Sequence, residues 1–419
     1  MIAVDLAHWA VDLGAPPARG GTPTAADLAL ADRSLQDTLA CAIAARQEPI
    51  IARSRSLGEA GRWAVASHIV DFDDLHMPST THISTVCVPA TLATGGGPRD
   101  YLAGAGVMAR IGTALGWSHY SAGWHATTTS GAMGAAACAA SALGLDAAQT
   151  ATALALAVPA SGGVRRAFGT DAKSLQVGFA VDAGLRAAAL AADGASADPR
   201  AVDEWLRLVG GETDVAADLE TGAPAVPDGL AIKVYPCCYA LQRPIAAIGE
   251  IRSQIDVADV QRIVVRTPDC TVTPLVHHRP QTGLEGKFSL EYAVAAALLD
   301  DYCGFATFTD DAVQRPEARR LIPMVEIELG SGSGGLLAGH VELDVHVDGG
   351  VLHSTRLELP PGAPTRPPTS AQLDRKIEDC LAGSGVSARE LSWPLAADVL
   401  RHTLADATAF QTTVGANAR

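Results

Sequence analysis

The stretch PAVPDG, at residues 224–229, separates two sequence patterns, and this change decides the fold. Before it, alanine-rich apolar segments are joined by short turns with glycine or proline, and alternating β-branched residues are almost absent. After it, segments such as DVQRIVVRTP (259–268) alternate between apolar and polar residues, as strands do. The pattern predicts a mainly α protein, with a large all-helical domain and an inserted smaller α+β domain.

Capping residues indicate where several helices of the first part begin and end. Thr24 can cap a helix that runs to about Arg46, and Asp146 can cap a helix that stops at Pro159. Gly144 ends the alanine-rich segment before Asp146, because glycine readily takes the left-handed conformation that follows helices. Further helices are predicted over 131–143, 174–193, 371–382 and 394–409.

The second part mixes helices and strands. Pro236 opens a predicted helix over 236–252, and Ser289 caps one over 289–301. Strands are predicted over 259–268, 324–330, 339–350 and 351–359, and the last two are joined by the turn Asp348-Gly349-Gly350. The proline-rich LPPGAPTRPP (359–368) is a second linker. The predicted domains are 1–228 plus 364–419 for the helical domain and 229–363 for the α+β domain.

Length and charge bound the possible partners. The chain has 419 residues, 48% of them hydrophobic, and a formal net charge of −15. This length favours two domains. An excess of acidic residues repels nucleic acid and anionic membranes, so we expect neither as a partner. The most apolar stretch, 131–160, is mainly alanine and is interrupted by Asp146 and Gln149, so we expect buried helices there and no membrane span.

Cysteines and short motifs argue against metals and organic cofactors. The eight cysteines are scattered and form no CxxC pair, and zinc or iron–sulfur spacing is absent. We therefore expect free thiols, a cytoplasmic location and no metal. The N-terminal stretch lacks the basic start of a signal peptide. No glycine-rich nucleotide motif follows a predicted strand, so we expect no cofactor and neither redox nor phosphoryl-transfer chemistry.

Charged and titratable residues recur just before, or in the first turn of, predicted helices. The segments are DFDDLHMPSTTHIST (71–85), GWHATTTSG (123–131), GTDAKSLQVG (169–178), AIKVYPCC (231–238) and EGKFSLEY (285–292). Helix N-termini present unpaired N–H groups and the positive end of a dipole, which favour anions. We therefore predict one pocket for a polycarboxylate, with acid–base groups in its wall. The residues concerned are Asp71, Asp73, His82, His125, Lys173, Lys233 and Tyr292.

Each of these residues also has a structural interpretation. The DFDD aspartates can cap and turn the backbone instead of forming an acid–base cluster with His76 and His82, whose six-residue spacing also lacks metal-binding phasing. His125 can be structural, although a position beside a helix start suits a neutral base. The two lysines can be ordinary surface residues, although their flanks are apolar. The tyrosine can belong to the core or donate a hydrogen bond to an oxyanion.

The same stretches resemble the MmgE/PrpD family over nearly the whole chain. The resemblance is carried by DFDDLHMPSTTH (71–82), HYSAGWHATTTSGAMGAAA (119–137), FGTDAKSLQVGFAVDAG (168–184), KVYPCCYALQRP (233–244) and RPQTGLEGKFSLEYAVAAALLDD (279–301). It implies a cofactor-free homodimer in which an α+β lid covers a helical domain, with the active site in the cleft between them. Members include 2-methylcitrate dehydratase, cis-aconitate decarboxylase and iminodisuccinate epimerase.

The resemblance also implies roles for individual residues. Catalytic roles are implied for Asp71, His82, His125 and Tyr292, and substrate binding for Asp73, Lys173, Lys233 and Cys238. The chain departs from the family pattern at four positions. Many members have Thr in place of Leu75, Pro in place of Ile83 and His in place of Gln176. At Cys238, the decarboxylase has a His. The departure at Cys238 favours a reaction other than decarboxylation.

The implied function is a cofactor-independent lyase that abstracts a proton next to a carboxylate of a di- or tricarboxylate, like 2-methylcitrate dehydratase. A decarboxylase or an iminodisuccinate-type epimerase remains an alternative, because loss of hydroxyl, loss of CO₂ and reprotonation can all complete such a reaction. HYSAGWH and PCCYALQRP are closest to the epimerase, whereas Tyr292 is a feature of the lyases. A catalytically silent relative that binds a carboxylate is the alternative outside enzymes.

Overall fold

The computed structural model describes residues 1–14, 23–213, 219, 223–332, 335–336 and 338–416. The chain forms two compact units. Unit 1 comprises Met1–Ala231 and Cys380–Arg419, and unit 2 comprises Ile232–Asp379. The structure is 61% helical with a small mixed sheet of four strands, so the predicted mainly α class with a small α+β part is confirmed. The predicted domain boundaries and the lid stay predictions.

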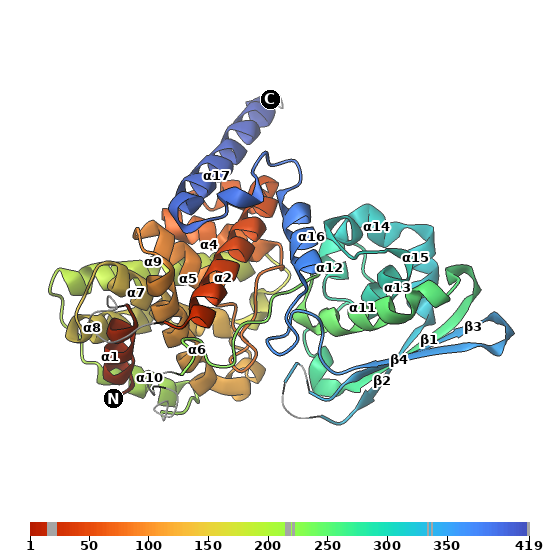
Figure 1. Ribbon diagram of the computed structural model, residues 1–419, viewed down its shortest axis with the longest axis horizontal. Coiled ribbons are helices and arrows are strands. Elements are labelled where there is room, and N and C mark those ends of the chain that lie inside the picture. Colours follow the sequence, from red (N-terminus) through yellow and green to blue (C-terminus); the bar gives the residue numbers. More distant parts are fainter. Residues whose placement is uncertain (15–22, 214–218, 220–222, 333–334, 337, 417–419) are drawn as a thin grey trace. The chain divides into compact units, whose positions relative to one another are not determined.

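Unit 1 is a bundle of helices with an alanine-rich core (Figure 1). Buried alanines such as Ala132, Ala136 and Ala153 lie on facing helices, which small side chains allow to approach closely. The helices are α1 (Ile2–Gly14), α2 (Ala25–Ala44), α3 (Pro49–Arg53), α4 (Glu59–Ile69), α5 (Ser84–Ala93), α6 (Pro98–Ser121), α7 (Ala126–Ala142), α8 (Ala147–Ala157), α9 (Ala172–Ala192), α10 (Arg200–Leu208) and α17 (Trp393–Ala416).

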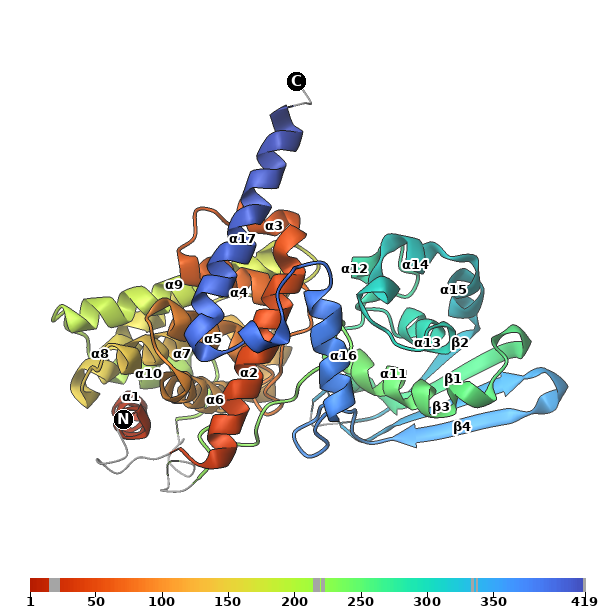
Figure 2. The same ribbon diagram turned by 45° about the horizontal axis from the view of Figure 1, so that its top comes forward.

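Helix α7 lies at the centre of unit 1 and packs against α5, α6, α8 and α9 (Figure 2). Residues 126–140 of α7 are all buried. Two glycines make room for it: a Cβ at Gly104 of α6 would overlap the sulfur of Cys138, and a Cβ at Gly184 of α9 would overlap the carbonyl oxygen of Ala132. Side chains carried by α7 and α9 are therefore held on a tightly packed scaffold.

The capping predictions for unit 1 are confirmed. Thr24 accepts a hydrogen bond from the N–H of Asp27, whose side chain in turn accepts from the N–H of Thr24. Asp146 and Gln149 form the same reciprocal cap on α8. Gly144 has a φ of +68° just after α7, the left-handed conformation expected at that end.

The predicted start of α7 at residue 131 is wrong, because the helix already begins at Ala126. Threonine has a modest helix propensity and can equally act as a cap. Here the hydroxyl of Thr128 donates to the His125 carbonyl oxygen at 2.9 Å, and that of Thr129 donates to the Ala126 carbonyl oxygen at 3.1 Å. The threonines therefore lie inside the first turn, and His125 becomes the residue that precedes the helix.

Unit 2 contains helices on one face of the four-stranded sheet, with α11 and α13 covering that face (Figure 1 and Figure 2). Its elements are α11 (Tyr239–Ile251), β1 (Val260–Pro268), α12 (Gly283–Gly286), α13 (Leu290–Leu299), α14 (Asp310–Gln314), α15 (Pro316–Leu321), β2 (Val325–Gly330), β3 (Val341–Val347), β4 (Leu352–Leu357) and most of α16 (Ser370–Leu381).

The four predicted strands are confirmed, in the spatial order β2-β1-β3-β4. Strand β1 pairs parallel to β2 and antiparallel to β3, which pairs antiparallel to β4. Gly349 and Gly350 have positive φ in the turn between β3 and β4, as the hairpin prediction requires. Ile263 and Val265 of β1 are buried in the apolar cluster of unit 2, to which helices α11 and α13 also contribute.

The prediction that Pro236 opens a helix is wrong, because α11 begins only at Tyr239. The side-chain oxygen of Gln242 accepts hydrogen bonds from the N–H groups of Val234 and Tyr235, both at 3.1 Å. The amide of Gln242 thus stabilises an irregular turn where the proline signal predicted a helix. Lys233 consequently lies in a loop and not at a helix start.

Helix α9 is long and apolar enough, by length and composition alone, to cross a membrane. In the structure, 44% of its most apolar window is buried, and α9 packs against α4, α7 and α8. A core helix of a bundle passes the same test, so this is weak support for a span. Its first turn carries Lys173, which takes part in the polar cluster described next.

Candidate active site

The DFDD segment forms a buried loop directly after α4. The sequence predicts Asp71 just before a helix, but in the structure Asp71 follows the end of one. Asp71 has a φ of +59°, a conformation rare outside glycine. Its Oδ1 accepts a hydrogen bond from Lys173 Nζ at 2.8 Å, and the two side chains are only 7% and 10% exposed. Strained backbone conformations cluster at active sites and ligand clamps, so this position is a candidate for a functional one.

Asp73, two residues further along, lies between two histidines. Its Oδ2 accepts from His68 Nδ1 at 2.7 Å and lies 3.1 Å from His82 Nδ1. The rings of His68 and His82 meet edge to face, with centroids 4.9 Å apart. Asp73 and His68 are fully buried, whereas the side chain of His82 is 14% exposed. His82 is therefore the member of this trio that solvent or a ligand can reach.

The loop that carries His82 is fixed on both sides. Its Nδ1 lies 2.6 Å from the Asp74 carbonyl oxygen, and its backbone N–H donates to Thr127 Oγ1 on α7 at 3.1 Å. Helix α5 begins two residues later at Ser84. The imidazole is thus held by the DFDD loop and the central helix.

His125 stands at the N-cap of α7, and its ring stacks on that of His68 with centroids 5.8 Å apart. Phe168 packs edge-on against it at 4.9 Å and also lies under the Lys173 ammonium, 5.6 Å from Nζ to the ring centroid. On its other side, His125 Nδ1 lies 2.6 Å from the amide nitrogen of Gln176, one turn along α9 from Lys173. The cluster therefore joins α4, α7, α9 and the DFDD loop.

Burial and charge set the protonation of the cluster. Burial lowers the pKa of His68 to about 4 and holds the pKa of His125 well below its usual range, and the charge of Lys173 lowers both further. Burial would raise the pKa of Asp73, but the two histidines that face it hold that pKa well below its usual range. At neutral pH the cluster holds an ionised Asp73 beside neutral imidazoles of His68 and His125.

Two neighbouring polar residues have structural partners. Nδ1 of His76 lies 2.6 Å from Ser79 Oγ and Nε2 lies 2.9 Å from the Pro227 carbonyl oxygen, so this histidine ties its own loop to a distant one. The Asp74 carboxylate bonds to the N–H and hydroxyl of Ser84 in the first turn of α5. The capping interpretation of DFDD therefore holds for Asp74.

The remaining predicted site residues belong to unit 2. Lys233 is 1% exposed, and its carbonyl oxygen accepts a hydrogen bond from Lys376 Nζ at 3.0 Å. Cys238 is buried at the N-cap of α11. Tyr292 is fully buried in the first turn of α13, which Ser289 caps as predicted, and its hydroxyl donates to the Thr307 carbonyl oxygen. That bond is what a core tyrosine makes.

The structure thus brings Asp71, Asp73, His82, His125 and Lys173 together in unit 1. A pocket shared with the residues of unit 2 stays a prediction. His68 was missed, because a single histidine near the end of an apolar helix is usually structural. Its position three residues before DFDD was the available signal, since a histidine that close along the chain can reach an aspartate of the loop.

The trio His68, Asp73 and His82 could also hold a metal ion, because one ligand atom from each lies within 4.8 Å of the others. Imidazole and carboxylate together suit zinc or another transition metal. However, both Nδ1 atoms already face the Asp73 carboxylate at 2.7 and 3.1 Å. A metal would have to replace these contacts, and the expectation that no metal is needed stays a prediction.

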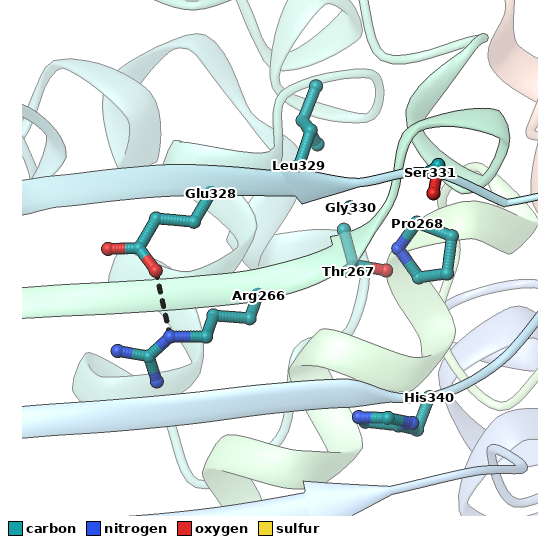
Figure 3. Close-up of a pocket in the computed structure, with 8 residues that line it drawn as sticks. All are labelled: Arg266, Thr267, Pro268, Glu328, Leu329, Gly330, Ser331 and His340. Carbon is teal, nitrogen blue, oxygen red and sulfur yellow. Dashed lines mark hydrogen bonds and ion pairs between the residues drawn. The ribbon is translucent and has the colours of Figure 1, made fainter.

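A separate cavity of about 410 Å³ lies at the end of the sheet in unit 2 (Figure 3). It is lined by Arg266, Thr267, Pro268, Glu328, Leu329, Gly330, Ser331 and His340. Arg266 already pairs with Glu328 at 2.8 Å and with Asp344 at 2.6 Å. Since its strongest charge is neutralised and none of the predicted site residues lines it, this cavity is a weaker candidate than the histidine cluster.

Comparison with known proteins places these observations in a family. Residues 60–208 match the MmgE/PrpD N-terminal domain, and residues 235–400 match the MmgE/PrpD C-terminal domain. A cis-aconitate decarboxylase of Aspergillus terreus (strain NIH 2624 / FGSC A1156) is 26% identical over 343 residues, which cover 70% of this chain and 68% of that protein. The cis-aconitate decarboxylase of Homo sapiens is 27% identical over 297 residues, or 63% of this chain and 60% of that protein.

Proposed function

Because the chain belongs to the MmgE/PrpD family, we propose that it is a cofactor-independent lyase acting on a di- or tricarboxylate, in the manner of 2-methylcitrate dehydratase. The observation that carries the proposal is the buried cluster of unit 1, in which histidines, two carboxylates and a lysine come together from α4, α7, α9 and the DFDD loop. This combination supplies a base, a group that orients it and a positive charge.

Proton abstraction next to a carboxylate requires groups of these types. A C–H bond next to a carboxylate is weakly acidic, so its cleavage needs a positioned base and stabilisation of the charge that moves onto the carboxylate. His82 is the accessible imidazole, and Asp73 orients it. Lys173 supplies positive charge for the carboxylate, and Asp71 holds its ammonium in place at 2.8 Å.

The charges of the cluster suggest that a residue of unit 2 also binds the substrate. Within the cluster, Lys173 contributes one positive charge, while Asp71 and Asp73 contribute negative charges. A tricarboxylate would be repelled unless another cation faced it. Lys233 is our candidate for that cation, and Cys238 and Tyr292 are candidates for further substrate contacts, as the family resemblance implies.

Decarboxylation is the second candidate, because the matched proteins in Aspergillus terreus and Homo sapiens are named cis-aconitate decarboxylases. Both reactions move negative charge onto the substrate next to a carboxylate, so both can use the same lysine and histidines. Cys238 argues against decarboxylation, since the resemblance implies a histidine at this position in the decarboxylase. Dehydration therefore remains the first proposal.

The proposal is tested with the purified full chain in D₂O, followed by NMR. The substrates are 2-methylcitrate, citrate, cis-aconitate and iminodisuccinate, each also incubated with Lys173→Met protein as the matched control. We expect deuterium exchange and a new olefinic signal with 2-methylcitrate. Loss of CO₂ from cis-aconitate would assign decarboxylation, and inversion of iminodisuccinate would assign epimerisation. If the protein binds a carboxylate but shows neither exchange nor turnover, it is not an enzyme for these substrates, and the alternative of a catalytically silent relative is favoured.

A further inference from the structure

The side chain of Gln176 is oriented by one backbone residue. Its Oε1 accepts a hydrogen bond from the N–H of Val164 at 3.1 Å, while its Nε2 donates to the Val164 carbonyl oxygen at 3.3 Å. Turning the amide over would place two donors against each other and two oxygens against each other. The backbone of Val164 therefore decides which end of the amide is the nitrogen.

That nitrogen faces His125. Nε2 of Gln176 lies 2.6 Å from Nδ1 of His125, and an amide nitrogen can only donate. Nδ1 must therefore be the acceptor, so the proton of the neutral ring sits on Nε2. This Nε2 is buried and has no hydrogen-bond partner among the residues that the structure describes. A buried donor that no described residue satisfies costs free energy, so we expect a bound substrate to supply its acceptor.

The backbone around this contact fits closely. The N–H of His125 donates to the Gly163 carbonyl oxygen at 3.1 Å. Gly163 has a φ of +108°, and a Cβ there would overlap the hydroxyl of Thr128 and lie 3.0 Å from Gln176 Oε1. Only glycine allows this approach, so the amide and the ring are held in place before any substrate binds.

His82 has the opposite arrangement. Its Nδ1 faces two acceptors, the Asp74 carbonyl oxygen at 2.6 Å and Asp73 Oδ2 at 3.1 Å. Nδ1 must therefore carry the proton, which leaves the lone pair on Nε2. The two histidines thus differ in what their Nε2 atoms can do, since that of His82 accepts a proton and that of His125 donates a hydrogen bond.

We propose that Gln176 is a positioning residue that holds neutral His125 in the Nε2–H form, so that His125 is the hydrogen-bond donor of the reaction and His82 is its base. This rests on the proposed function. In the first step the substrate C–H bond breaks, and its proton goes to His82 Nε2. The electron pair moves into the adjacent carboxylate, whose oxygen accepts a hydrogen bond from His125 Nε2–H. His125 neither gains nor loses a proton, because a neutral imidazole serves here as an electrophile.

The direct test observes the tautomer in the free enzyme and needs no substrate. Protein labelled with ¹⁵N in histidine is studied by long-range ¹H–¹⁵N NMR at about pH 8, above the ordinary histidine pKa of about 6.5. The signal of His125 is assigned by its loss in His125→Gln. We expect a protonated Nε2 and an unprotonated Nδ1 in the wild type, and the reverse in Gln176→Glu, whose carboxylate accepts from Nδ1. A protonated Nδ1 in the wild type overturns the proposal even if the enzyme is active.

Turnover provides the second measurement, with 2-methylcitrate as the probe. Gln176→Glu should lose about 10²-fold in kcat, the usual effect of removing one preorganised donor, with little change in melting temperature. Gln47→Glu, an exposed change of the same charge in unit 1, should behave like the wild type. His125→Gln keeps an N–H near the position of Nε2 and should be at least about 10-fold more active than His125→Leu. Equal loss in these two variants would make His125 the base and overturn the assignment.

If the wild type shows the expected tautomer but exchanges no proton of 2-methylcitrate, citrate, cis-aconitate or iminodisuccinate, the proposed function fails while the orientation of His125 by Gln176 stands. If the enzyme turns over and Gln176→Met changes neither the tautomer nor kcat, the inference fails while the proposed function stands.

Discussion

Lys173 and Asp71 show how one buried pair serves both charge and packing at the scale of single residues. Their side chains are almost entirely removed from water and lie 2.8 Å apart. An ammonium in such a place is costly without a counter-charge, and it acts strongly on a substrate carboxylate because little solvent screens it. Asp71 also adopts a left-handed backbone conformation, which links the pair to the DFDD loop.

Lys173→Met should lower kcat/KM by about 10²-fold or more, because a charge-assisted contact to the substrate disappears. It should also destabilise the fold by about 3–5 kcal/mol, because Asp71 stays buried without this cation. The double variant Asp71→Asn/Lys173→Met should regain much of the melting temperature but none of the activity. Recovery of activity in the double variant would show that the lysine matters only for folding.

Asp73→Asn should lower kcat by about 10²–10⁴-fold with a smaller effect on KM. The carboxylate faces Nδ1 of both His68 and His82, and an amide can present a donor to one of these rings and so reverse its tautomer. Steady-state kinetics with Asp12→Asn, an exposed change on α1, provide the control. A normal kcat in Asp73→Asn would remove Asp73 from the catalytic unit.

At the scale of elements, the start of α5 is bonded to a buried carboxyl group of the DFDD loop, that of Asp74, which accepts from the N–H and hydroxyl of Ser84. Burial raises the pKa of Asp74 to about 7, against the hydrogen bonds from Ser84 that favour its charged form. Since the pKa is raised above the ordinary 3.8, the folded state holds this proton over a pH range in which the unfolded chain has lost it. The contribution of Asp74 to stability is therefore present below about pH 4 and is lost as the pH rises to about 7.

Melting temperatures of the wild type and Asp74→Asn should converge or cross between about pH 4 and pH 7, with the wild type losing stability relative to the variant as the pH rises. The full difference would be a few kcal/mol at most, given about 1.4 kcal/mol for each pKa unit. Asp12→Asn should follow the wild type throughout. A constant difference between wild type and Asp74→Asn over this range would mean that Asp74 is already ionised in the folded protein.

At the scale of the whole molecule, the question is whether the two units contribute to one site. Lys233→Met should raise KM for a tricarboxylate by about 10-fold or more, because a buried positive charge that we propose binds a substrate carboxylate is removed. Lys287→Met, the same charge change at a partly exposed position of unit 2, is the matched control. Unchanged kinetics in Lys233→Met would confine the substrate-binding charges to unit 1.

Chelation tests the other property of the whole enzyme. EDTA should leave activity unchanged, and the purified protein should contain less than one equivalent of any transition metal. His68, Asp73 and His82 make this a real test, since their ligand atoms lie close enough to bind an ion. If chelation abolished activity and a divalent metal restored it, the enzyme would need a metal, and the metal rather than Asp73 would orient His82.

Much of the architecture could be predicted because its signals are local. The caps at Thr24, Asp146 and Ser289, and the four strands with their hairpin, depend on residues within a few positions of one another. The starts of α7 and α11 could not be predicted as easily. Each depends on a side chain that satisfies the backbone in one of two ways, the threonine hydroxyls in α7 and the Gln242 amide before α11.

The sequence by itself determined the family, the mainly α class and most of the polar residues of unit 1, because residue type and spacing along the chain carry that information. Only the tertiary structure decided what each polar group does. The proton of His82 is placed by acceptors on its own loop, whereas that of His125 is placed by Gln176, 51 positions away. His68 likewise belongs to the site only because folding places its ring beside those of His82 and His125. Protonation and orientation depend on contacts made through space, and these follow from packing rather than from position in the chain.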